Sequence, residues 1–302
     1  MLDIGGLFAY EFFQRAFLAG ICSALLCAAL GVFIVLKRAS LIGEGIAHLS
    51  FGGIAIGLVL AVYPLYTALI LALVGTLLIS LLNRSKIVYS ETAIGLMFSA
   101  GLAIGAVLAS VGGGFSVDLF AYLFGSLLTV SPQDLQIIVL LTLIALIFIG
   151  VFYKELVLMT FDERSAHLSG VPVVAFEVAF NVLVALAVVA SIKIVGALLV
   201  SALLITPAAS AMQLSGSFKG TMLSAFVLGL FSVMAGMLVS FYFDLATGGA
   251  IVLIGLLVFG VCVAVRKLFK LGKRELAPDT ICAHGMQETR FEAKDGSGEK
   301  DV

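Results

Sequence analysis

The chain has 302 residues, of which 62% are hydrophobic and 12% charged, and its mean hydropathy is +1.23. Soluble domains contain only about half apolar residues, so this composition excludes a water-soluble protein and indicates an integral membrane protein. The formal net charge of −1 gives no sign of a nucleic-acid partner, and it says little else because the charges are divided among the loops.

The apolar segments are each close to the roughly 20 residues that a helix needs to cross a bilayer. They are apolar on all sides, whereas the strands of a membrane β-barrel alternate between apolar and polar residues. An all-α bundle of eight or nine transmembrane helices is therefore the predicted fold. The nine predicted spans are 13–36, 41–62, 66–82, 91–111, 135–152, 171–191, 194–213, 221–243 and 249–265.

The segment 194–213 is the weakest of these spans. The link SIKIVG before it is very short, and Pro207 interrupts its apolar run. Eight crossings with one broken or re-entrant segment stay open beside nine, because irregular backbone is tolerated at membrane depth only where protein or water surrounds it.

The basic residues predict the orientation. If alternate loops are cytoplasmic, starting after the first span, one side receives ten Lys and Arg residues and the other only Arg15 and Lys193. Under the positive-inside rule this places the C-terminus in the cytoplasm and, with nine crossings, the N-terminus outside. The first span lacks the basic flank of a signal peptide, so we expect it to be retained in the cytoplasmic membrane. Residues 1–270 form one transmembrane domain in this interpretation, and 271–302 form a polar, disordered cytoplasmic tail.

Two connecting segments carry patterns of their own. Residues 112–134 begin with a glycine run and contain a half-length apolar patch, which predicts an external loop with a short, partly buried helix. Residues 153–170 are charged and end in glycine shortly before Pro172. That pattern predicts one short cytoplasmic helix with a stop signal.

Glu44 and His48 raise a chemical question, because they lie in the apolar stretch SLIGEGIAHLSFGGIAIGLVL. Their i,i+4 spacing places both side chains on one face of a helix. Ionisable groups inside a membrane are costly unless they are paired, hydrated or bound to an ion, so they tend to mark transport pathways. A carboxylate with an imidazole suits Zn²⁺, Mn²⁺ or Fe²⁺. The alternative is a mutual hydrogen bond that only neutralises the pair, and a metal would need further ligands or water.

Other polar residues are weaker candidates. Asp118 could attract cations at an external mouth, or it could cap the short helix that follows. Glu177 and Asn181 repeat the i,i+4 spacing and could line a path, but a hydrogen bond to a neighbouring helix is the favoured interpretation. Gly196 and Pro207, among small residues, could form a moving gate or equally a tight packing seam.

The cysteines do not form a disulfide pattern, since three lie inside apolar runs as packing residues and Cys282 lies in the tail. Cys282 and His284 make a poor metal site, because they are a lone pair of ligands in the predicted disordered tail. The GxxxxGK[ST] phosphate loop is absent from the sequence, so any ATP would be held by another subunit. No arrangement of nucleophile, base and oxyanion donors is apparent, and we expect no enzyme activity in this chain.

Three stretches together resemble a known family. RASLIGEGIAHLSFGGIAIG, SVDLFAYLFGSLLTVSPQDL and SIKIVGALLVSALLITPAASAMQL are similar, in this order, to the signature segments of the membrane permease of zinc, manganese and iron(II) ABC importers. The resemblance covers most of residues 13–265. Glu44 stands where the family more commonly has aspartate, and Ser126 stands where many relatives have an acidic residue. The resemblance implies that Glu44 and His48 contribute to the metal path.

The resemblance also implies partners. The expected assembly has two permease copies in the lipid bilayer, cytoplasmic ATP-binding subunits and an extracytoplasmic protein that delivers the metal. No cofactor is expected to be bound permanently, and the divalent metal is cargo. Alternatives are a permease for iron chelates or cobalamin and a secondary cation transporter in which Glu44 relays protons. Zinc, manganese and iron are not distinguished. The implied coupling helix, which docks on the ATP-binding subunit, comprises Phe161, Asp162, Glu163, Arg164, Ala166 and Gly170.

Overall fold

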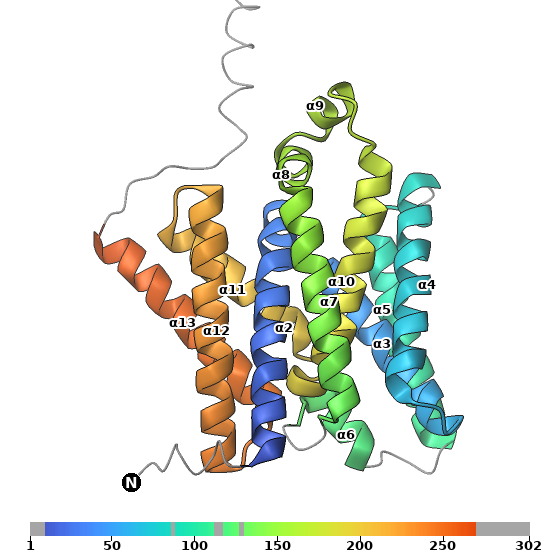
Figure 1. Cartoon of the computed structure of the whole chain (residues 1–302). Coiled ribbons are helices and arrows are strands. Elements are labelled where there is room, and N and C mark those ends of the chain that lie inside the picture. The colour runs from blue at the N-terminus through green and yellow to red at the C-terminus, as the bar shows by residue number, and fades with distance from the viewer. Residues whose placement is uncertain (1–9, 86–87, 112–116, 127–129, 270–302) are drawn as a thin grey trace, which may run out of the picture.

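A computed structural model describes residues 10–85, 88–111, 117–126 and 130–269 of the chain. Among these residues the regular structure is entirely α-helical, as the composition predicts (Figure 1). The helices are α2 (Glu11–Leu36), α3 (Leu41–Val59), α4 (Pro64–Ser85), α5 (Ser90–Val111), α6 (Val117–Phe124), α7 (Pro132–Val151), α8 (Tyr153–Phe161), α9 (Glu163–Leu168), α10 (Val173–Val195), α11 (Val200–Leu214), α12 (Phe218–Phe243) and α13 (Thr247–Phe269).

Eight of the described helices are long and apolar enough to cross a membrane, and α11 is shorter, with 15 residues. The segment that contains α11 nevertheless runs beside α13 from one end to the other. At one end the carbonyl oxygen of Val195 lies against Gly248, and at the other the Arg266 guanidinium donates to the Gln213 side-chain oxygen at 2.7 Å. The weakest predicted span, 194–213, thus contains one short helix, α11, with a turn before it. This segment packs beside the eight long helices.

The bundle has two distinct ends (Figure 1). The short helices α8 and α9 lie at one end, which we call the α9 end, and α6 lies at the other, the α6 end. The short helix predicted within 112–134 is confirmed as α6. The single helix predicted for 153–170 is wrong, because α8 and α9 are separate. Asp162 is extended, with φ of −148°, and its carboxylate accepts hydrogen bonds from the backbone N–H groups of Arg164 and Ser165, which starts a new helix.

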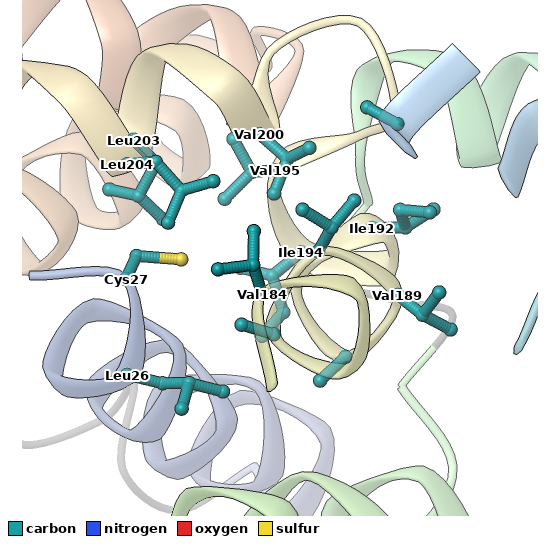
Figure 2. Packing of buried hydrophobic residues seen from close by; sticks show 14 of the residues in the cluster. Leu26, Cys27, Val184, Val189, Ile192, Ile194, Val195, Val200, Leu203 and Leu204 are labelled. Carbon is teal, nitrogen blue, oxygen red and sulfur yellow. The ribbon is translucent and has the colours of Figure 1, made fainter. Parts of the chain in front are cut away.

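The core lies where α2, α10 and α11 meet (Figure 2). Cys27 of α2, Val184 of α10 and Leu204 of α11 are among its fully or almost fully buried members. Lipid tails are as apolar as leucine side chains, so the hydrophobic effect does not drive helices together within a bilayer. Close packing of their side chains does so instead. The Cys27 sulfur lies 3.4 Å from the Ser191 hydroxyl, and the three described cysteines are free thiols, consistent with packing roles.

Glycines bring α3 unusually close to α4 and α5. A Cβ on Gly53 would lie 2.6 Å from the Ala68 Cα of α4, and a Cβ on Gly101 of α5 would lie 2.4 Å from the His48 carbonyl oxygen. Small residues of this kind allow helix backbones to approach one another in membranes. The two contacts fix α3, the helix that carries Glu44 and His48, between its neighbours.

We expect Gly101→Ala to destabilise the protein, because the new methyl group would push α5 away from the α3 backbone. Overpacking of this kind costs about 1–3 kcal/mol, more than alanine gains in helix propensity. The matched control is Gly150→Ala in α7, where a Cβ would meet nothing within 4 Å. Thermal unfolding in detergent measures both variants, and equal midpoints would contradict the close contact.

Candidate functional site

Glu44 and His48 lie on the first two turns of α3, and the His48 backbone packs against Gly101 in the middle of α5. His48 is buried, with 7% of its surface exposed, and Glu44 is half-buried. The His48 ring packs against Phe98 of α5, with 4.1 Å between the ring centroids and an interplanar angle of 57°. Of the eight long helices, α3 has the lowest mean hydropathy, 1.5. Protein rather than lipid surrounds most of it, which lowers the cost of its polar side chains.

The pair does not by itself complete a metal site. Within the described residues, no group of three or more His, Cys, Asp and Glu side chains is placed to hold a metal ion. Transition metals in proteins take four or more ligands. One carboxylate and one imidazole can therefore hold a passing ion only together with water, uncharged oxygen donors or another chain.

Asp118 is remote from this pair. It is the second residue of α6, whereas Glu44 lies in the first turn of α3, and α6 forms the end of the bundle opposite α8 and α9. The Asp118 side chain is outside the part of the chain that the structure describes. Its attraction of cations at an external mouth stays a prediction, separate from any site that Glu44 and His48 form.

The predicted coupling residues form one continuous projection at the α9 end (Figure 1). Hydrogen bonds from Ser165 hold the pKa of the exposed Asp162 carboxyl below its usual value, which keeps the cap ionised. Ala166 is fully buried against Met159 and Val173, so it anchors α9 to α8 and α10. Gly170 follows α9 with φ of 83°, a conformation that glycine adopts without steric cost. Phe161 ends α8, and Glu163 and Arg164 begin α9.

Gly196 and Pro207 lie at tight contacts. Gly196 ends α10 with φ of 91°, and a Cβ there would lie 2.2 Å from the Leu123 carbonyl oxygen of α6. Pro207 is buried inside α11, which continues through it. A Cβ on Gly229 of α12 would lie 3.4 Å from the Pro207 Cβ and 3.5 Å from the Ala28 Cβ of α2. These contacts are those of a packing seam, and a gating movement at either residue stays a prediction.

A cavity of ≈ 390 Å³ opens near the α9 end. Glu177 and Asn181 of α10 both line it, and within the described residues neither forms a hydrogen bond to another helix, contrary to the favoured interpretation of their spacing. Its wall combines charged and amide side chains from four parts of the chain, namely the turn after α2 and the helices α4, α9 and α10. They are Lys37, Arg38, Asn83, Glu163, Glu177 and Asn181.

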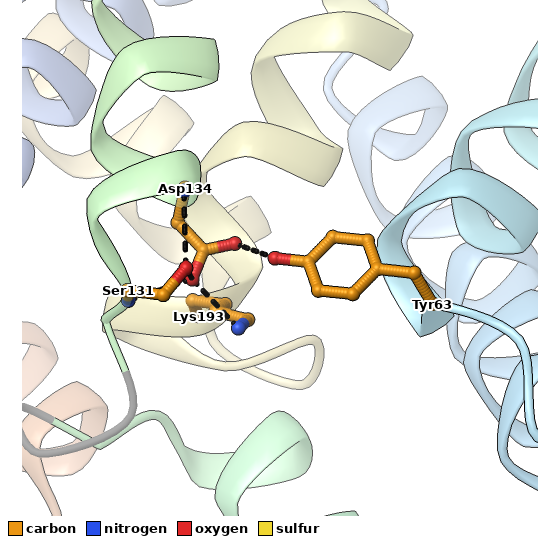
Figure 3. A network of polar contacts seen from close by, with 4 residues as sticks. All are labelled: Tyr63, Ser131, Asp134 and Lys193. Atoms are coloured by element: carbon orange, nitrogen blue, oxygen red, sulfur yellow. Dashed lines mark hydrogen bonds and ion pairs between the residues drawn. The ribbon is translucent and has the colours of Figure 1, made fainter.

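A buried polar network that the sequence pattern did not predict joins Tyr63, Ser131, Asp134 and Lys193 (Figure 3). Lys193 of α10 donates to the Asp134 carboxylate of α7 at 2.7 Å, and the two residues are 7% and 2% exposed. The Tyr63 hydroxyl and the Ser131 hydroxyl and N–H also donate to Asp134, and the ammonium group lies 5.5 Å from the Tyr63 ring centroid. The only sign of this network in the sequence was the presence of two charged residues, Asp134 and Lys193, beside apolar runs.

Comparison with known proteins identifies the family. Residues 9–266 match the model of the ABC 3 transport family. The chain is 34% identical to the manganese import system permease protein ScaB of Streptococcus gordonii over 85% of this chain and 92% of that protein. It is also 34% identical to the manganese transport system membrane protein MntC of Halalkalibacterium halodurans, over 84% and 87% of the two chains.

Two solved structures share the fold. PsaBC from Streptococcus pneumoniae, in complex with a Fab, matches with a TM-score of 0.78 and 32% identity over 88% of this chain and 98% of that one. A putative metal-chelate type ABC transporter in an inward-facing conformation matches with a TM-score of 0.71 but only 16% identity, which concerns the fold alone. The extent of the family match, with relatives above 30% identity over most of their length, shows that this chain belongs to the ABC 3 transport family.

Proposed function

We propose that this chain is the permease subunit of an ATP-binding cassette importer and that its cargo is Mn²⁺. The observation that carries the proposal is the buried His48 with Glu44 one turn away, in a chain whose relatives at 34% identity are named manganese permeases. A carboxylate and an imidazole are acceptable ligands for Mn²⁺, and they also bind Zn²⁺ and Fe²⁺. The relatives' names, not the two ligands, favour manganese among the three.

The assembly proposed around the chain contains two further kinds of subunit and a second copy of the chain itself. A cytoplasmic ATP-binding subunit docks on α8 and α9, and an extracytoplasmic protein delivers the ion at the α6 end. A second copy of this chain would bring a second Glu44 and His48 pair, which supports its inclusion because the described residues of one chain provide too few ligands. The permease performs no covalent chemistry, and ATP hydrolysis on the partner alternately opens the two sides of the path.

The orientation follows from the positions of the basic residues. Lys37 and Arg38 follow α2 and Arg266 and Lys267 end α13, all on the side of the bundle to which α8 and α9 project. Under the positive-inside rule this side faces the cytoplasm. The C-terminus would then be cytoplasmic and the α6 end external, in the cytoplasmic membrane.

The test is transport by the reconstituted assembly. The permease, its ATP-binding subunit and its binding protein are placed in liposomes, and uptake of Mn²⁺, Zn²⁺ and Fe²⁺ is measured with and without ATP. We expect ATP-dependent Mn²⁺ uptake that the other ions do not match at equal concentration. Uptake driven by an ion gradient without nucleotide would refute the assignment in favour of a secondary transporter. Uptake of a metal chelate but not of the free ion would refute the cargo.

A further inference from the structure

Helix α8 rests on an aromatic side chain from a distant part of the sequence. Phe218, the first residue of α12, lies 5.7 Å from Tyr153 and 6.1 Å from Phe161, measured between ring centroids, so it contacts both ends of α8. Both contacts are edge-to-face, with interplanar angles of 67° and 70°. Aromatic pairs in this geometry add about 0.5–1.5 kcal/mol to the energy of burial. A displacement of α8 must therefore either move Phe218 or break these contacts.

The aromatic contacts continue to the end of α2. The Phe218 ring is 5.2 Å from the Phe33 ring, which is almost fully buried, and the Phe33 ring is 5.9 Å from the Phe180 ring of α10. Four rings thus join α8, α12, α2 and α10 without a gap. We call this set the aromatic chain, and its members are Phe161, Phe218, Phe33 and Phe180.

A rigid turn joins the end of α2 to α3. Lys37 is the C-cap residue after α2, Arg38 has φ of 56°, and the N–H groups of Arg38 and Ala39 donate to the carbonyls of Val35 and Ile34. This is the Schellman pattern of helix termination, which satisfies the last carbonyls of the helix. Glu44 follows within the first turn of α3. Because the turn is short and hydrogen-bonded, movement of the α2 end is passed to the helix that carries Glu44 and His48.

Lys37 provides a second connection across the cavity near the α9 end. Its ammonium group lies 5.7 Å from the Phe180 ring centroid, and Glu163 of α9 and Glu177 of α10 line the same cavity. Burial lowers the pKa of Lys37, and the charges of Glu177 and Glu163 oppose that shift. Lys37 thus shares this cavity with one carboxylate of α9 and one of α10.

We propose that the aromatic chain and Lys37 form the mechanical link through which α8 and α9 move the metal-carrying helix α3. The inference deepens the proposed function and rests on it, because it assumes that the ATP-binding subunit docks on α8 and α9. Chains of packed side chains can carry coupling between distant sites, and here ring contacts run from Phe161 of α8 to Phe33 in the last turns of α2. Phe218 and Lys37 are positioning residues in this scheme, and neither contacts the ion.

The experiment measures Mn²⁺ uptake and ATP hydrolysis in the same liposomes, with the full assembly and the Phe218→Leu variant. We expect ATP hydrolysis to persist while the number of ions imported per ATP falls roughly tenfold, a typical size for energetic coupling between sites. The matched control is Phe241→Leu at the other end of α12, where the half-buried ring makes an edge-to-face contact with Phe13 at 5.7 Å. The Phe241→Leu variant should import as many ions per ATP as the unsubstituted assembly.

Lys37→Met keeps the apolar stem and removes the charge, so it tests the second connection with less disturbance of packing. We expect a lower ratio of ions to ATP, and Lys37→Arg should restore most of it. An unchanged ratio in Phe218→Leu and Lys37→Met overturns the inference. The inference is also overturned if uptake and ATP hydrolysis fall equally and little ATP-binding subunit is recovered with the permease. Phe218 and Lys37 would then be needed to bind that subunit rather than to transmit its movement. Failure of the unsubstituted assembly to import would instead overturn the proposed function.

Discussion

Replacing Glu44 or His48 with alanine is expected to abolish Mn²⁺ uptake while the permease still inserts and assembles with its partners. Each substitution removes one of the two ionisable side chains of α3 that we propose as ligands, and in the described part of the chain no third His, Cys, Asp or Glu completes a metal-binding group with them. An ion that has lost most of its water would then meet too few donors to compensate its dehydration. The readout is metal accumulation in liposomes, with assembly checked by recovery of the ATP-binding subunit.

Two further variants on α3 sharpen this result. Glu44→Asp keeps the carboxylate and shortens its arm by one methylene, and the family more commonly has aspartate there, so we expect uptake to be retained with altered metal preference. Ser50→Ala removes a buried hydroxyl that donates to the Ile46 carbonyl at 2.8 Å, two residues beyond His48. It should leave transport intact. Full uptake by Glu44→Ala or His48→Ala would exclude the pair from the path.

The span boundaries could be read from the sequence where lipid faces the helix, because hydropathy reports that environment. The prediction for α5, residues 91–111, matches Ser90–Val111 almost to the residue. The prediction for α10 ended at 191, four residues before Val195, where a charged residue interrupts the apolar run. Lys193 is tolerated there because its charge is paired within the bundle. A hydropathy pattern cannot reveal a partner that lies 59 residues away in the chain.

The candidate site was predictable only in part, because some of its contacts join residues that are distant in the sequence. The i,i+4 spacing of Glu44 and His48 is local, and the helix predicted for them is confirmed as α3. The cavity beside Glu177 and the ring contacts of Phe218 depend on how distant helices pack. The division between α8 and α9 depends on one residue, Asp162, whose preference for capping competed with a continuous helical pattern.

The second large effect is expected at the buried ion pair. Asp134→Ala should destabilise the protein by roughly 3–5 kcal/mol, the usual cost of breaking a buried ion pair by removing one partner. The ammonium group of Lys193, 7% exposed, would lose its carboxylate. The same substitution removes the capping box with Ser131 that begins α7. The free energy of unfolding in detergent micelles measures the loss.

Lys193→Met should cost less than Asp134→Ala, because the Asp134 carboxylate would still accept hydrogen bonds from Tyr63 and Ser131. If the pair is coupled, adding Asp134→Ala to Lys193→Met should cost much less than Asp134→Ala alone, since no buried ammonium group remains to be stranded. The matched control is the exposed pair of Arg15 and Glu11 on α2, 2.5 Å apart, where Arg15→Met should cost no more than about 1 kcal/mol. Additive losses at Asp134 and Lys193 would mean that the two charges stabilise the bundle independently of each other.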